Sequence, residues 1–272
     1  MALKTIREEP RGNLTLRLVE SGGAYSGVII GAKGGIVARL SGDNAEDVWQ
    51  RLQIEAGKAD NSYFGFDGAR VRFLRFFPGG FGSAGYTAGE RDYKLAAKQK
   101  LDTTAPLAEA ATGKGFGEAI LAAFRATNLL SPFEKTRLQG MLRGPSADTF
   151  IQAAAQFTLG TGLPALLDME RVLRPHDNAK WTVVTYLPFL WRPDVHMFLK
   201  PEVTQDFATR VGHRFRLDYE PRLDLPVYES LLDLARQTEE ELVELAPRDR
   251  IDVQSFIWVV GAYDEAADKP AH

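Results

Sequence analysis

The chain of 272 residues contains no cysteine. A disulfide, a thiolate zinc site, a cysteine-held iron–sulfur cluster and a cysteine nucleophile are therefore excluded. Long apolar runs are also missing, because no window reaches the roughly 18 apolar residues of a membrane-spanning helix. The first residues, MALKTIREEPRGN, lack the apolar core of a signal peptide. We therefore expect a soluble, cytoplasmic protein with no membrane contact.

Histidine is scarce, and the four that occur, at positions 176, 196, 213 and 272, lack the i,i+4 pairing of a metal-binding helix. No HExxH motif occurs either. We expect no metal and no cofactor. The glycine-rich run Gly113-Lys114-Gly115-Phe116-Gly117 lacks the Gly-Lys-Ser/Thr ending of a phosphate loop and does not follow an apolar strand, so it is not interpreted as one.

The overall composition is that of a globular protein, with 44% hydrophobic and 25% charged residues. The length predicts one large domain, or a small unit fused to a larger one. The net charge of −3 hides an uneven distribution, since residues 1–140 hold 19 basic and 15 acidic side chains and the remainder holds 14 and 21. A polyanion would meet the first part more readily, although dispersed surface charge explains the same numbers.

Two patterns predict the fold. Residues 13–40 alternate apolar and polar side chains between glycine turns, which indicates an antiparallel meander of about three strands. A helix from Asp43 to about Ala56 is expected to cover it. From Glu90 onward the period is helical, with a strong start at Ser131-Pro132-Phe133-Glu134. We predict an α+β, mainly α protein: a β-rich unit over residues 1–88 and a helical domain of about eight helices over residues 89–272.

Aromatic and basic side chains interleave in residues 61–87, where Arg70, Arg72 and Arg75 lie among phenylalanines and glycines. Such a segment suits DNA through phosphate contacts and stacking, and a core strand with a solvated arginine face is the alternative. In the next predicted helix, Lys94 and Lys98 share one face with Arg91. This basic stripe suits phosphates too, with an ordinary solvated helix face as the alternative.

The stretch from Pro247 to Tyr263 changes abruptly from dense charge to an apolar run. Asp249 fits the N-cap of a helix, and Asp252 falls in its first turn, where a carboxylate meets free backbone N–H groups. The alternative interpretation is that a buried helix carries the Asp252 carboxylate into a pocket.

Ile251-Asp252-Val253-Gln254-Ser255-Phe256-Ile257-Trp258 resembles the segment V-D-x-H-x-x-R/W-x that carries the catalytic aspartate of helix-hairpin-helix DNA glycosylases. The order of a small β domain and a helical domain is also similar to some members. The chain departs from that family because no glycine occurs between Gly212 and Gly261, where its Gly-rich hairpin would lie. The resemblance implies an enzyme that flips a damaged or modified base out of double-stranded DNA and cleaves its N-glycosidic bond.

The resemblance assigns a role to each candidate residue. Asp252 would stabilise the oxocarbenium-like sugar, with Asp249 as the second catalytic candidate. Gln254 would read a base edge, and the pocket walls would be Trp181, Tyr186, Trp191 and Trp258. The DNA backbone would be held by Arg70, Arg72, Arg75, Lys94, Lys98 and Arg248. Two other classes remain open: a non-enzymatic DNA-binding or regulatory module in which Asp252 is a cap, and a protein-interaction subunit that docks through the acidic helix 227–245. The base recognised and the oligomeric state are open as well.

Overall fold

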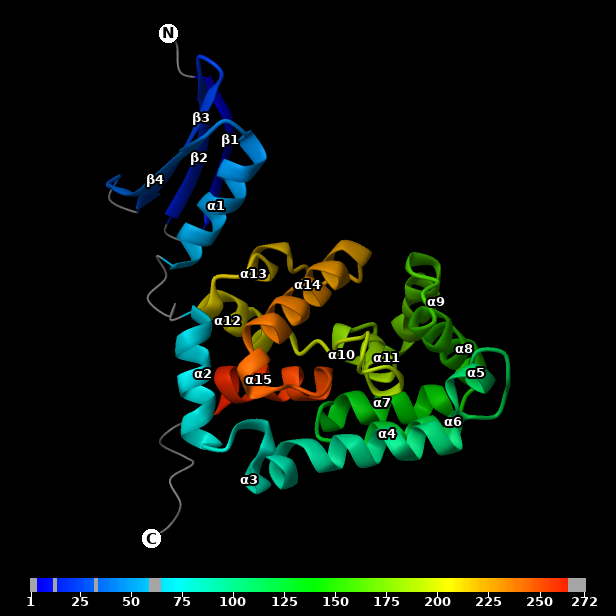
Figure 1. Cartoon of the computed structure of the whole chain (residues 1–272). Helices are drawn as coiled ribbons and strands as arrows, with labels where there is room; N and C mark the ends of the chain where they lie inside the picture. The colour runs from blue at the N-terminus through cyan, green and yellow to red at the C-terminus, as the bar shows by residue number, and fades with distance from the viewer. Residues whose placement is uncertain (1–3, 12–13, 32–33, 59–64, 264–272) are drawn as a thin grey trace.

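The computed structural model describes residues 4–11, 14–31, 34–58 and 65–263 (Figure 1). The chain begins with a four-stranded antiparallel sheet in which neighbouring strands are consecutive: β1 (Lys4–Arg11), β2 (Leu14–Ser21), β3 (Ala24–Gly31) and β4 (Ile36–Gly42). Gly22 and Gly23 join β2 to β3 with φ of 61° and 84°, the backbone that a tight hairpin requires. The expected meander is present with one additional strand, β1.

Helix α1 (Ala45–Lys58) covers one face of this sheet. Asn44 starts it, since its side-chain oxygen accepts hydrogen bonds from the backbone N–H groups of Glu46 and Asp47. Helix and sheet enclose a small core of their own, formed by Leu16, Leu18, Ile29, Val48, Trp49, Leu52 and Ala56. A Cβ at Gly27 would lie 3.0 Å from Leu52 Cδ1, so the absence of a side chain there lets the helix approach.

The remaining described chain is a helical body, which confirms the α+β, mainly α class. Its helices are α2 (Gly65–Phe76), α3 (Ala84–Tyr86), α4 (Asp92–Thr104), α5 (Leu107–Ala110), α6 (Gly117–Arg125), α7 (Pro132–Leu142), α8 (Ala147–Thr158), α9 (Leu163–Leu173), α10 (Trp181–Val184), α11 (Tyr186–Trp191), α12 (Pro201–Val211), α13 (Phe215–Asp218), α14 (Leu225–Glu241) and α15 (Arg250–Ala262). They are shorter and more numerous than the eight expected, because prolines and glycines interrupt the periodic segments.

Segment 61–87 adopts a helix over its described part, so the alternative of a core strand is wrong. Phe66, Ala69 and Phe73 of α2 are buried in the large core of the helical body, and Phe73 packs against Phe256 of α15 at 5.1 Å between ring centroids. The predicted division at residue 88 places α2 with the sheet, whereas its buried side chains belong to the helical body. Helix α1 also contacts α12, which joins the two units.

Helix α15 lies inside the helical body and packs against α12, α2 and α14 (Figure 1). A Cβ at Gly261 would lie 2.8 Å from Val203 Cγ1, so the glycine permits the close crossing of α15 over α12. Asp252, Val253, Gln254 and Ser255 are all buried, which means that even the polar side chains of this helix face protein. Within the described residues, no helix has the length and apolar character needed to cross a membrane.

Candidate functional site

Asp249 is the N-cap of α15, as the sequence predicts. Its carboxylate accepts a hydrogen bond from the backbone N–H of Ile251 at 2.9 Å. The same carboxylate accepts two hydrogen bonds from Arg91, at 2.8 and 2.7 Å, in a two-pronged ion pair. Asp249 therefore fixes the start of α15 to the start of α4.

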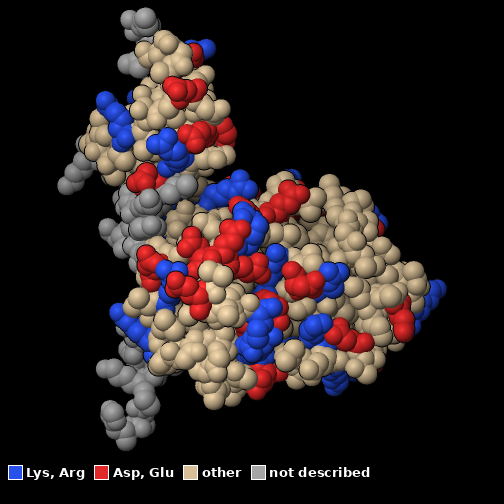
Figure 2. Space-filling view, in the orientation of Figure 1, with Lys and Arg blue, Asp and Glu red and all other residues tan. Residues whose placement is uncertain are grey.

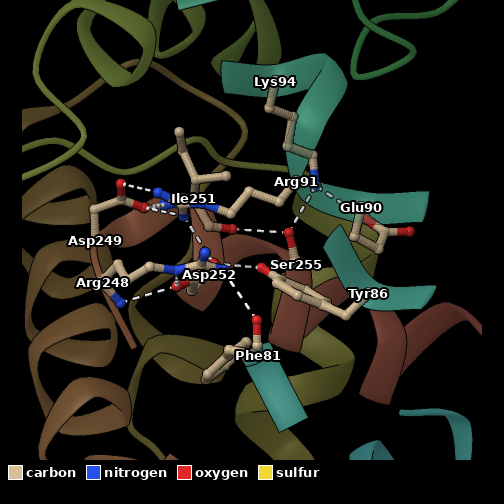
Figure 3. A network of polar contacts seen from close by, with 10 residues as sticks. All are labelled: Phe81, Tyr86, Glu90, Arg91, Lys94, Arg248, Asp249, Ile251, Asp252 and Ser255. Carbon is tan, nitrogen blue, oxygen red and sulfur yellow. Dashed lines mark hydrogen bonds and ion pairs between the residues drawn. The ribbon is translucent and has the colours of Figure 1, made fainter. Parts of the chain in front are cut away.

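The Asp252 carboxylate is fully buried at the centre of a polar cluster (Figure 3). The Tyr86 hydroxyl donates to it at 2.5 Å and Arg91 Nη1 at 2.8 Å. Arg248 contributes its backbone N–H at 2.8 Å and guanidinium hydrogen bonds at 3.0 and 3.2 Å. Both carboxylate oxygens point at these donors. Asp252 therefore links α15 to Arg248, which lies just before the helix, and to Tyr86 and Arg91, which lie more than 150 residues earlier in the chain.

The charge state of this cluster follows from its contacts. Burial alone would raise the pKa of Asp252, but hydrogen bonds from Arg248 and Tyr86 hold that pKa below its ordinary value. For Arg91, burial works against the charge, and the pairing with Asp249 and Asp252 outweighs it and raises the pKa. The cluster is thus an ionised carboxylate held between two guanidinium groups at neutral pH.

A π-helical turn, Thr87–Arg91, leads into α4 and places the next set of contacts. Lys94 is fully buried, and its ammonium donates to Glu90 Oε2 at 3.0 Å and to Ser255 Oγ at 2.8 Å. The Tyr263 hydroxyl donates to the other Glu90 oxygen at 2.7 Å. Burial lowers the pKa of Lys94, with Glu90 opposing the shift. The basic stripe of α4 is therefore turned inward at Arg91 and Lys94.

A small pocket lies beside Lys94, and we call it the Gln254 pocket; its cavity volume of about 20 Å³ has room for about one water molecule. Its walls are the side chains of Tyr93, Lys94, Asn128, Leu129, Phe198, Lys200, Gln254 and Trp258. Gln254 is only 4% exposed, and its Oε1 is buried with no hydrogen-bond partner among the described residues. Buried polar atoms in folded proteins nearly always have a partner, so this oxygen indicates a missing one.

The other predicted pocket walls are placed differently. Trp258 lines the Gln254 pocket with Gln254, whereas Trp181 lines a neighbouring groove. Tyr186 and Trp191 are core residues, because the Tyr186 hydroxyl donates to the Ala123 carbonyl at 2.6 Å and Trp191 Nε1 donates to the Ala105 carbonyl at 3.0 Å. The structure thus brings one of the four predicted walls, Trp258, together with Gln254.

Most of the residues predicted to bind the DNA backbone instead make contacts with other residues of the protein. Arg70 donates to the Glu241 carbonyl and pairs with Asp67, while Arg72 donates to the Val260 carbonyl at 2.9 Å at the end of α15. Lys98 pairs with Asp102 at 2.7 Å, and Arg75 is exposed on α2. Acidic and basic side chains are intermixed over the helical body in Figure 2. This face does not present a continuous basic surface.

Sequence reasoning missed Tyr86, Tyr93, Asn128, Phe198 and Lys200. Phe198 and Lys200 lie in residues 175–222, which are dense in aromatic, proline and basic side chains, but nothing in that sequence indicates contact with α15. No family model, curated protein or solved structure matches the chain.

Proposed function

We propose that the chain acts on DNA by taking one extruded base into the Gln254 pocket. The observation that supports this is the buried Gln254 Oε1, which has no hydrogen-bond partner in the part of the chain that the structure describes. A buried polar group left unpaired costs about 1–3 kcal/mol, and a ligand that donates a hydrogen bond there recovers that free energy. A side-chain amide offers a donor and an acceptor side by side, which is the arrangement that pairs with a base edge.

The walls of the pocket are suited to a flat, hydrogen-bonding ring, which enters only when these walls move apart, because the cavity volume is about 20 Å³. Trp258, Tyr93 and Phe198 supply aromatic surface for stacking, and Lys94 supplies a buried donor next to Gln254. A base inside a duplex cannot reach such a pocket until it leaves the stack, which costs a few kcal/mol and is easiest at a mismatch or damaged position. The proposal therefore predicts a preference for DNA with a weakly paired base.

The test uses duplexes that carry 2-aminopurine either opposite thymine or opposite an abasic site, because this base becomes fluorescent when it leaves the stack. We expect tighter binding and a larger fluorescence change with the abasic partner. Gln254→Met keeps the length of the side chain and removes the amide, and it should weaken binding at least tenfold, about 1.4 kcal/mol. Gln152→Met is the matched control, since Gln152 donates to the Gly113 carbonyl and lines no part of this pocket.

Equal binding by the Gln254→Met variant and the parent would reject the pocket as the base site. Failure to bind any of these duplexes would instead favour the protein-interaction subunit. The acidic side chains Glu239, Glu240 and Glu241 at the end of α14 would then be the surface to test against a basic partner.

N-glycosidic cleavage by Asp252 is the second candidate, and the observation that favours it is that the surrounding donors keep this buried carboxylate ionised. An ionised carboxylate can stabilise an oxocarbenium-like sugar. In the described conformation, however, all its contacts are to the protein. The Arg248 side chain is 45% exposed and is held by Asp252 and the Phe81 carbonyl, so a substrate would have to displace it to reach the carboxylate.

This second candidate is tested by base release, detected as strand breaks after alkali treatment. Asp252→Asn should abolish release, and Arg248→Met should retain it because the carboxylate and its Tyr86 and Arg91 contacts remain. Removing the Asp252 charge leaves the buried Arg91 paired with Asp249 alone and costs up to about 3–5 kcal/mol, so folding of the variant is checked by circular dichroism. Equal release by a folded Asp252→Asn variant and the parent would reject the mechanism.

A further inference from the structure

The Gln254 pocket opens next to a wider groove, and one side chain belongs to both. Lys200 lines the pocket and also lines the groove, whose cavity volume is about 460 Å³. The other groove residues are Glu134, Ala179, Lys180, Trp181, Thr182, Pro201, Glu202, Tyr219 and Pro221. A ligand whose ring occupies the pocket therefore has its next chemical group beside Lys200.

The electrostatics at this junction favour an anion. Lys200 is half-buried, and its ammonium donates a long hydrogen bond to the Leu129 carbonyl at 3.4 Å. Among the described residues, no carboxylate lies within ion-pair distance of it, in contrast to Lys94 and Lys98. A half-buried cation without a counter-ion attracts an anion more strongly than an exposed one, because water screens it less.

The start of α12 adds to the same field. Lys200 is the N-cap of this 11-residue helix and makes no side-chain cap hydrogen bond, and Pro201 follows at the first helical position. The geometry of a helix leaves the backbone N–H groups of residues 202 and 203 without an acceptor in the helix, at its positive end. Gln254, which is 4% exposed and unpaired at Oε1, faces the pocket that Lys200 also lines. Two separate features thus converge on a ligand here.

The two acidic side chains that line the groove, Glu134 and Glu202, differ in how they affect the binding of an anion. The Glu134 carboxylate is occupied by the Ser131 backbone N–H at 2.8 Å, the Ser131 hydroxyl and the Thr182 hydroxyl. Glu202 is exposed in the first turn of α12 and opposes an anion at Lys200. Its removal should therefore strengthen the binding of a phosphate.

We propose that Lys200 and the start of α12 bind the phosphate attached to the nucleotide whose base enters the Gln254 pocket. This inference rests on the proposed function and identifies its phosphate contact, which the sequence placed instead at Arg70, Arg72, Arg75, Lys94, Lys98 and Arg248. The base enters from the groove, so the adjoining backbone passes Lys200. The neighbouring Trp181, Tyr219 and Pro221 provide an uncharged wall along that path.

The test measures binding of the 2-aminopurine duplex by fluorescence anisotropy over a range of salt concentrations. Lys200→Met should weaken binding severalfold and lower the slope of log K against log salt by about 1, the value for one lost phosphate contact. Glu202→Gln should strengthen binding. Lys100→Met is the matched control, because Lys100 is exposed on α4 and lines neither the pocket nor the groove, and its slope should equal that of the parent.

A second arm locates the phosphate. A neutral methylphosphonate in place of the phosphate next to 2-aminopurine should weaken binding by the parent and have no further effect on Lys200→Met. Nucleoside and nucleoside monophosphate, tested as free ligands, distinguish a mononucleotide from a polymer as the source of the phosphate. If Gln254→Met weakens binding and Lys200→Met leaves affinity and slope unchanged, this inference fails and the proposed function stands. If Gln254→Met has no effect, the proposed function fails first.

Discussion

Replacing Gln254 by methionine should stabilise the ligand-free protein, which is unusual for a change at a buried position. Methionine has nearly the same length and volume, so the pocket walls need not move. Gln254 is only 4% exposed, and its side-chain oxygen has no hydrogen-bond partner among the described residues. An unpaired buried group costs about 1–3 kcal/mol, and glutamine and methionine lose similar rotamer freedom, so the stability gain should fall within that range.

The measurement is urea unfolding of the ligand-free protein, followed by far-ultraviolet circular dichroism, which reports mainly on the helical body. Gln152→Met is the control for side-chain chemistry. Gln152 is half-buried and donates to the Gly113 carbonyl at 2.8 Å, so its replacement should destabilise the protein by about 1 kcal/mol. The two identical substitutions are therefore expected to change the free energy of unfolding in opposite directions.

A loss of stability in Gln254→Met equal to that in Gln152→Met would refute the reasoning. It would mean that the Gln254 amide has a partner in the free protein, such as bound water. A gain in stability together with a loss of DNA binding is the pattern of a residue that is retained for function at a cost to the fold.

Three further outcomes follow from the buried contacts. The free energy of unfolding should fall as pH drops below about 4. The Asp252 carboxylate has a lower pKa in the folded protein than in the unfolded chain, so it contributes stability above the unfolded pKa and loses that contribution as pH falls through the folded pKa. Urea titrations in acid should show a smaller fall for Asp252→Asn. Ser131→Ala removes the hydroxyl that accepts from the Glu134 backbone N–H and leaves the Ser131 backbone N–H bonded to the Glu134 carboxylate, and it should cost about 1 kcal/mol in the same assay. Gly117→Ala should cost about 1–3 kcal/mol, since its Cβ would lie 2.4 Å from the Leu142 carbonyl oxygen, while Gly140→Ala, in open space on α7, should stabilise by about 0.5–1 kcal/mol.

Much of the fold could be predicted from short sequence motifs, because helix caps are formed by residues that lie next to one another in the chain. The Ser131-Pro132-Phe133-Glu134 start holds with both capping hydrogen bonds, and Asp249 caps α15 as expected. Strand β1 was not predicted because its sequence, KTIREEPR, has little apolar alternation. It is an edge strand of the sheet and pairs with β2 on one side.

Arginine alternation in the aromatic segment suggested a strand, but the large apolar side chains decide which structure forms. Phe66, Phe73 and Phe77 are spaced by 7 and 4 residues, which places them on one face of a helix, and all three join the helical core. Arg70 and Arg72 then satisfy carbonyl groups of α14 and α15. A charge pattern alone could not distinguish these internal contacts from a DNA-binding surface, since the acceptors lie about 170–190 residues away along the chain.

The candidate site could be predicted only in part for the same reason. Asp252 and Gln254 both stood out as polar residues in an apolar helix, and a two-residue separation turns them about 200° apart on that helix. Because α15 is buried on both of these sides, each side chain needs a partner from elsewhere in the fold. Asp252 receives hydrogen bonds from Tyr86 and Arg91, more than 150 residues earlier in the chain, and becomes an anchor. Gln254 faces Lys94 and Trp258 across a pocket with its oxygen unpaired among the described residues, so the hydrogen bond that completes this helix is the one we assign to the ligand.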